Sequence, residues 1–125
     1  MTIKILLVDD APDFTIYMKK RLVARGMDIW TAFNGQEGLD IVKNTPLDIV
    51  ILDVLMPGID GLKTLQQIKK LKPDVQVIVL TGHGTVETSV DGMKLGATDF
   101  LLKPCDFETL LDSIQTAYQN RITLG

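Results

Sequence analysis

Five polar residues of this sequence have the side chains that phosphoryl transfer requires. They are two adjacent aspartates, a third aspartate, a threonine and a lysine: Asp9, Asp10, Asp53, Thr81 and Lys103. A carboxylate can act as a nucleophile, a group of carboxylates binds a hard divalent cation such as Mg²⁺, and hydroxyl and ammonium groups bind phosphoryl oxygens. Three carboxylates about 5 Å apart repel one another by roughly 3 kcal/mol per pair, so a cation is needed to hold them together. This chemistry depends on a fold that brings the five residues to one place.

Five short stretches rich in apolar and β-branched residues recur along the chain, and four of them end just before those polar residues. The stretches are residues 3–8, 27–32, 48–52, 75–80 and 98–102. Three of them are nearly continuous apolar runs, which are typical of strands buried on both faces of a parallel sheet.

The segments between these stretches carry apolar residues at helical spacing. The residues that share a helical face are Phe14, Tyr17, Met18 and Leu22; Leu62, Leu65 and Ile68; Val86, Val90, Met93 and Ala97; and Phe107, Leu110, Leu111, Ile114 and Tyr118. A weaker helix is expected over residues 36–43. Gly26 and Gly96 stand where helix C-caps are expected, and Asp106 is the expected N-cap of the last helix. The order strand-helix, repeated five times, predicts a doubly wound α/β sandwich of the (βα)5 type.

This architecture predicts that the polar residues converge, because ligands of open α/β sheets bind outside the carboxyl ends of the strands. Asp53 stands alone after a central strand, so it is the expected nucleophile, while Asp9 and Asp10 form an expected metal-binding pair. Each residue also has a local interpretation: Asp10 could cap the first helix, and Thr81 and Lys103 could lie in ordinary turns. The joint placement of all of them at one end of the sheet favours a functional site.

Composition limits the other classes of function. The chain has 125 residues, of which 46% are apolar and 23% charged, which predicts a single domain. Its net charge of −3 disfavours direct binding to nucleic acid, and the basic residues at 19–21 and 69–72 are expected to be solvated helix faces. The longest apolar runs have four residues, and Cys105 is the single cysteine, so neither a membrane span nor an internal disulfide is expected. We therefore expect a soluble, cytoplasmic protein.

Together these motifs resemble the receiver domain of response regulators in two-component phosphorelays, of the CheY-like type. The motifs are LVDD at residues 7–10, Asp53 with MPGIDG at 56–61, LTG at 80–82 and GATDFLLKP at 96–104. The resemblance covers essentially residues 1–125, and it implies a flavodoxin-like fold with a parallel sheet of strand order 2-1-3-4-5.

The resemblance implies that Asp53 accepts a phosphoryl group from the phosphohistidine of a sensor histidine kinase or of a histidine phosphotransfer protein. It implies that Mg²⁺ is held by Asp53, by one or both of Asp9 and Asp10, and by the backbone carbonyl of Leu55. Thr81 and Lys103 would bind the phosphoryl oxygens. A cis peptide bond is implied before Pro104, which X-Pro bonds allow at about 0.5–1 kcal/mol.

Signalling in this family couples Thr81 to an aromatic residue on the last strand, here Phe100, and is read at the face of the fourth helix, fifth strand and fifth helix. Many relatives carry Tyr where this chain has Phe100, so contacts through that hydroxyl are not expected. Leu55 and His83 occupy positions that flank the path of the attacking water. Because Leu55 cannot orient water, we expect no rapid side-chain-assisted hydrolysis; the simplest interpretation of His83 is an exposed loop residue.

The implied function is a phosphorylatable switch that catalyses its own phosphorylation and dephosphorylation and turns over no external metabolite. Its expected targets are a downstream protein or a covalently linked output domain whose linker starts after residue 121, and a phosphorylation-dependent homodimer is compatible with the resemblance. A phosphohydrolase of the haloacid-dehalogenase type would need an aspartate at Leu55, and a flavin or nucleotide carrier would need Gly, Ser or Thr in place of Asp9 and Asp10. A receiver that signals by binding alone would not need all five residues.

Overall fold

The computed structural model describes residues 2–54, 61–82 and 86–124. Five strands and five helices alternate along the chain. The strands are β1 (Lys4–Val8), β2 (Asp28–Ala32), β3 (Ile49–Leu52), β4 (Gln76–Thr81) and β5 (Asp99–Leu102). The helices are α1 (Pro12–Ala24), α2 (Gly35–Asn44), α3 (Gly61–Leu71), α4 (Val86–Lys94) and α5 (Phe107–Leu124).

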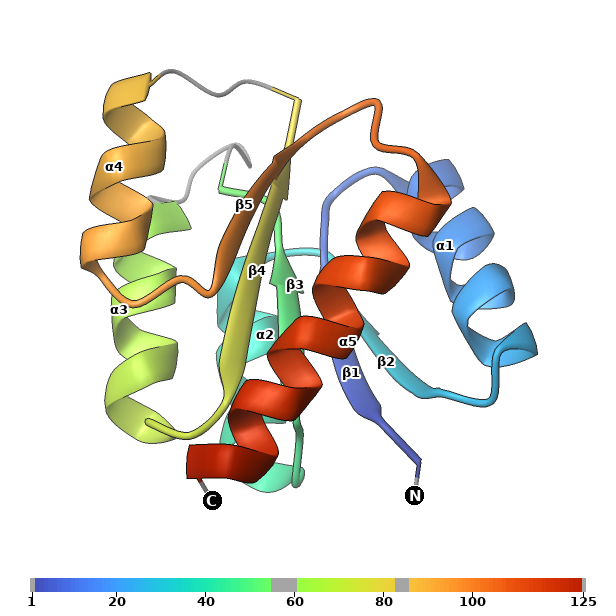
Figure 1. The fold of residues 1–125 in the computed structure, drawn as a ribbon, viewed down its shortest axis with the longest axis horizontal. Coiled ribbons are helices and arrows are strands. Elements are labelled where there is room, and N and C mark those ends of the chain that lie inside the picture. The colour runs from blue at the N-terminus through green and yellow to red at the C-terminus, as the bar shows by residue number, and fades with distance from the viewer. Residues whose placement is uncertain (1, 55–60, 83–85, 125) are drawn as a thin grey trace.

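The strands form one parallel sheet in the order β2-β1-β3-β4-β5, which confirms the expected topology. The register aligns the strand ends that matter for the site: Val8 pairs with Leu52 and with Ala32, and Thr81 pairs with Leu102. The start of β1 and the end of α5 lie at the amino ends of the strands, away from the strand ends that form the site (Figure 1).

Helices cover both faces of the sheet, with α1 and α5 on one face and α2, α3 and α4 on the other (Figure 1). The two faces have separate cores because successive strand residues point in opposite directions. Leu6, Val50 and Val79 belong to the core under α2, α3 and α4, whereas Ile5 and Ile51 belong to the core under α1 and α5. Burial on both faces explains the continuous apolar runs of the central strands.

Two predicted helix C-termini, at Gly26 and Gly96, are confirmed. Gly26 and Gly96 have φ angles of 84° and 103°, the left-handed conformation that glycine adopts without a steric penalty. The alternative role of Asp10 as a helix cap is wrong, because α1 starts at Pro12 and its N-cap residue is Ala11, which makes no side-chain capping bond.

Three residues that share the predicted apolar faces are half-exposed. Tyr17 on α1 is 52% exposed, and Val90 and Met93 on α4 are 45% and 46% exposed. Tyr17 lies on the outer side of α1, where its hydroxyl accepts a hydrogen bond from Arg21. Val90 and Met93 form an exposed apolar surface on α4. This helix packs on the sheet next to β5 (Figure 1). No helix among the described residues has the length and apolar character needed to cross a membrane.

Candidate phosphorylation and metal site

The backbone brings Asp9 and Asp53 together at the carboxyl end of the sheet. The amide of Asp9 donates to the carbonyl oxygen of Ala32, and the amide of Asp53 donates to that of Val8, each over 3.0 Å. These bonds continue the parallel ladder one residue past the strands. The backbone positions of both aspartates are therefore fixed by sheet hydrogen bonds rather than by a loop.

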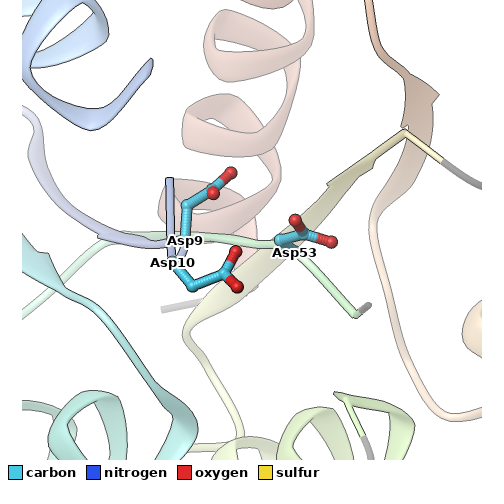
Figure 2. Close-up of side chains that lie close together, drawn as sticks. All are labelled: Asp9, Asp10 and Asp53. Carbon is cyan, nitrogen blue, oxygen red and sulfur yellow. The ribbon is translucent and has the colours of Figure 1, made fainter. Parts of the chain in front are cut away.

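The three aspartates form one cluster. Each offers a carboxylate oxygen, and these oxygens lie within 4.8 Å of one another (Figure 2). Asp9 and Asp53 are only 1% and 7% exposed, whereas Asp10 is exposed. The predicted convergence of the acidic residues at one sheet edge is therefore observed.

Lys103 supplies a positive charge to this cluster. Its Nζ lies 2.5 Å from Oδ2 of Asp9 and 3.5 Å from Oδ2 of Asp53, and its side chain is 21% exposed. Its backbone amide donates to the carbonyl oxygen of Thr81 over 2.8 Å, which fastens the end of β5 to that of β4. The Lys103–Pro104 peptide bond is cis, as the resemblance implied.

Three carboxylates and one ammonium leave a local charge of about −2. An all-oxygen site with this charge suits a hard divalent cation, because oxygen ligands select Mg²⁺ or Ca²⁺ over softer metals. The residues present therefore fit a metal of this class, with the cluster of Asp9, Asp10 and Asp53 as its side-chain ligands.

Thr81 and Phe100 lie on the same face of the sheet. Thr81 is fully buried at the end of β4, two residues after Val79, and Phe100 is the cross-strand partner of Val79. The Phe100 ring is half-buried and faces α4: a Cβ added to Gly92 would meet it at 3.6 Å.

Comparison with known sequences identifies the family. The sequence model of the response regulator receiver domain matches residues 5–115. The chain belongs to this family. Receiver domains of this family are signalling modules of two-component systems.

Individual relatives agree with this assignment. The transcriptional regulatory protein ZraR of Salmonella typhimurium is 36% identical over 92% of this receiver domain, but the match covers only 26% of the ZraR chain. The chain thus spans about a quarter of the length of the curated relatives it matches. The crystal structure of a CheY-like receiver domain from Methanospirillum hungatei superimposes with a TM-score of 0.96, at 27% identity and over 100% of both chains.

A third relative has been crystallised with a modified aspartate. It is a response regulator from Burkholderia pseudomallei with a phosphorylated aspartic acid, a calcium ion and citrate. Its TM-score against this receiver domain is 0.87, at 28% identity, over 94% of this chain and 69% of that one.

Local packing in the receiver domain restricts the aspartates further. Oδ1 of Asp9 accepts a hydrogen bond from the amide of Ala11 over 3.0 Å. A Cβ added to Gly61 would lie 2.2 Å from Cα of Val54, so only glycine permits the start of α3 to approach the residue after Asp53 so closely. Tight packing therefore fixes the backbone on both sides of the acidic cluster.

Two predicted site residues, Leu55 and His83, lie outside the described residues. One neighbour of the site was missed by the sequence analysis, which placed Phe14 only on the apolar face of α1. The ring centre of Phe14 is 4.1 Å from Nζ of Lys103. No spacing rule connects these two residues, since they are 89 positions apart in the sequence.

Proposed function

We propose that this receiver domain is switched by phosphorylation of Asp53, with the phosphohistidine of a sensor histidine kinase or of a histidine phosphotransfer protein as donor. The observation that carries the proposal is the place of the Asp53 carboxylate, within 4.8 Å of carboxylate oxygens of Asp9 and Asp10 and 3.5 Å from the Lys103 ammonium. A nucleophile, a metal-binding group and a phosphoryl-binding cation thus share one site.

The transfer forms one bond and breaks one. A carboxylate oxygen of Asp53 attacks phosphorus, and the electron pair of the P–N bond goes to the donor's imidazole nitrogen, which takes a proton from solvent. The product is an acyl phosphate on Asp53. Attack by water on the same phosphorus restores the Asp53 carboxylate and releases inorganic phosphate, so the domain acts as its own phosphatase. Since Leu55 cannot orient this water, we expect the phosphorylated state to last longer than seconds.

Asp9, Asp10 and Asp53 are the side chains that would hold Mg²⁺, together with the backbone carbonyl of Leu55. The chemistry that Mg²⁺ supplies when bound is neutralisation of carboxylate and phosphoryl charge. Lys103 already contacts Asp53, so a phosphoryl group on Asp53 falls within reach of its ammonium. Thr81, at the end of the neighbouring strand, would donate a hydrogen bond from its hydroxyl group to another phosphoryl oxygen.

The Thr81 hydrogen bond is the proposed trigger of the switch. One hydrogen bond to a charged group contributes about 1.5–3 kcal/mol, which shifts a two-state equilibrium by about 10- to 150-fold. Phe100 would rearrange against α4 in response. The surface that reads out this change is the face of α4, β5 and α5, where Val90, Met93 and Leu102 are 45%, 46% and 53% exposed.

We infer that residues 1–125 form one receiver domain that acts in the cytoplasm and does not itself bind nucleic acid. The partner at the readout face is a downstream target protein, a linked output domain or a second receiver in a phosphorylation-dependent homodimer. The names of the regulatory relatives support a linked output domain, because ZraR is a transcriptional regulator of which this chain matches about a quarter.

The proposal is tested with Mg²⁺ and beryllofluoride, a mimic of the phosphoryl group, followed by NMR of the backbone amides. We expect the wild-type protein to show shifts at Thr81 and along β5 and α4, and Asp53→Asn to show none. Asp48→Asn, the same substitution at the other end of the sheet, is the matched control and should respond as the wild type does. An equal response of wild type and Asp53→Asn, or no response in either, would contradict the proposal and favour a receiver that signals by binding alone.

A further inference from the structure

Lys103 has an aromatic neighbour in addition to its two acidic ones. The Phe14 ring centre lies 4.1 Å from Nζ of Lys103, within the range in which a cation is attracted to the face of an aromatic ring. The ammonium is therefore enclosed by the Asp9 carboxylate, the Asp53 carboxylate and the Phe14 ring. The first two belong to the phosphorylation site, and the third has had no role so far.

Phe14 is itself held in place. It lies in the first turn of α1, next to Thr15, whose hydroxyl donates to the carbonyl oxygen of Ala11 over 2.9 Å. Its half-buried side chain packs on the core under α1 and α5, which contains Met18 and Leu110. The ring therefore packs one side against the apolar core while it contacts the Lys103 ammonium, and this packing restrains the position of the ring.

An aromatic ring suits this task because it attracts the ammonium without forming an ion pair with it. A lysine side chain is a flexible four-carbon stem, so its charge must be restrained to act at one point. The two carboxylates restrain it only while they carry uncompensated charge. A divalent cation on Asp9 and Asp53 would weaken both ion pairs, but it would leave the attraction of the neutral Phe14 ring largely in place.

We propose that Phe14 is a positioning residue for phosphoryl transfer, whose ring keeps the Lys103 ammonium beside Asp53 when the carboxylates are engaged by metal. This inference rests on the proposed function, and it concerns a residue that acts through Lys103 rather than on the phosphoryl group itself.

The test compares Phe14→Leu, which removes the ring, with Phe14→Tyr, which keeps it. Tyr17→Leu removes an aromatic ring from the same helix and is the matched control, since Tyr17 contacts Arg21 instead of Lys103. For each folded variant, Mg²⁺ affinity is measured alone, and beryllofluoride affinity is measured at saturating Mg²⁺. The ε-methylene proton shifts of Lys103 are recorded in the same samples, because an aromatic face moves them upfield.

We expect Phe14→Leu to weaken beryllofluoride binding about 2- to 30-fold, the range that the loss of one cation–π contact allows. Mg²⁺ affinity should stay at or slightly above that of the wild type, because Lys103 competes with the metal for Asp9. The upfield shift of the Lys103 ε-methylene protons should disappear in Phe14→Leu. Phe14→Tyr and Tyr17→Leu should match the wild type in all three measurements.

Beryllofluoride binding by Phe14→Leu at wild-type affinity would overturn the inference while leaving the proposed function intact. An equal loss of Mg²⁺ and beryllofluoride affinity would also overturn it, since that pattern indicates a general distortion of the site around Asp9. Failure of the wild type to bind beryllofluoride would contradict both proposals. The comparison of wild type with Asp53→Asn described above shows whether the proposed function itself has failed.

Discussion

The two ends of the sheet differ in how their charged side chains are partnered. At the amino end, Asp48 accepts a hydrogen bond from the amide of Lys4 over 2.9 Å, and its other oxygen lies 3.6 Å from Nε of Arg121. Lys69 donates to the carbonyl oxygens of Pro73 and Val75, each over 2.8 Å. At the carboxyl end, Lys103 is shared between two of three clustered carboxylates.

This difference separates stability from function. At the amino end, Asp48 has a backbone donor and an opposite charge nearby, and Lys69 has two carbonyl acceptors, so these two charges have partners without a ligand. The carboxyl end keeps about two negative charges in excess, and this repulsion costs folding free energy until a cation binds. Sites that bind ligands often carry such a cost, because an arrangement already neutralised would gain little from the ligand. Substitutions at the two ends should therefore have effects of different kind.

The largest expected effect comes from a pair of glycines, one near each end. Gly61→Ala places a methyl group 2.2 Å from Cα of Val54, which should lower the free energy of unfolding by about 3 kcal/mol and move Asp53. Gly26→Ala adds its methyl group in open space, and only the φ of 84° is unfavourable, at about 1–2 kcal/mol. Urea denaturation and Mg²⁺ titration measure both variants. Mg²⁺ affinity should fall in Gly61→Ala alone, and equal effects of the two variants would contradict the close packing beside the site.

A pair of aspartates should give changes of opposite sign in stability. Asp10→Asn removes one charge from the acidic cluster, so we expect the metal-free protein to gain about 0.5–1 kcal/mol, a small value because Asp10 is exposed and screened by solvent. The same variant should lose about tenfold or more in Mg²⁺ affinity. Asp48→Asn should instead lose about 1 kcal/mol, because the Lys4 amide and Arg121 lose a charged partner.

Thermal unfolding with and without Mg²⁺ checks this second pair. For the wild type and Asp48→Asn, Mg²⁺ at ten times its dissociation constant should add about 1.4 kcal/mol, and a chelator should remove the gain. Asp10→Asn should gain much less at the same Mg²⁺ concentration. Destabilisation of the metal-free protein by Asp10→Asn would show that the acidic cluster is not under repulsive strain.

The smallest effect concerns Cys105, two residues after Lys103. Burial raises the pKa of its thiol, and the negative charges of Asp106 and Asp99 raise this pKa further. A raised pKa in the folded state means that the folded protein holds the thiol proton more tightly than the unfolded chain does. Stability should therefore fall slightly as pH rises from the ordinary thiol pKa through the raised one.

Alkylation by iodoacetamide, followed by mass spectrometry across a pH series, checks this expectation. Cys105 in the folded protein should react more slowly at neutral pH than in the urea-unfolded chain, with its midpoint at higher pH. A faster reaction in the folded state would mark Cys105 as a reactive thiol and contradict the raised pKa.

The fold was largely predictable from the sequence because each strand is a short apolar run with a helix after it. The strand bounds shift by one residue at most, as in β4, which continues through Thr81 instead of ending at Leu80. Parallel topology then brings Asp9, Asp53 and Lys103 together, since it places all strand ends at one edge. The family resemblance supplied the strand order, which periodicity alone does not determine.

Three features could not be predicted in this way. Helical spacing places Val90 and Met93 on one apolar face but does not show whether a neighbour covers that face, and both residues are half-exposed. Helix α1 starts at Pro12, after a hydrogen bond that the Ala11 amide donates to Oδ1 of Asp9, and Asp10 does not cap it. The contact of Phe14 with Lys103 joins the first turn of α1 to the residue that follows β5, and no local pattern encodes a contact between elements so far apart in the sequence.

The most direct test of the central claim is to locate the acyl phosphate. The protein is incubated with Mg²⁺ and acetyl phosphate and reduced with borohydride, which converts a phosphorylated aspartate to homoserine, and the peptides are mapped by mass spectrometry. We predict homoserine at position 53, none at positions 9 or 10, and none anywhere when a chelator is present. Homoserine at position 9 or 10, or no homoserine in a protein that binds Mg²⁺, would contradict the assignment of Asp53 as the phosphoryl acceptor.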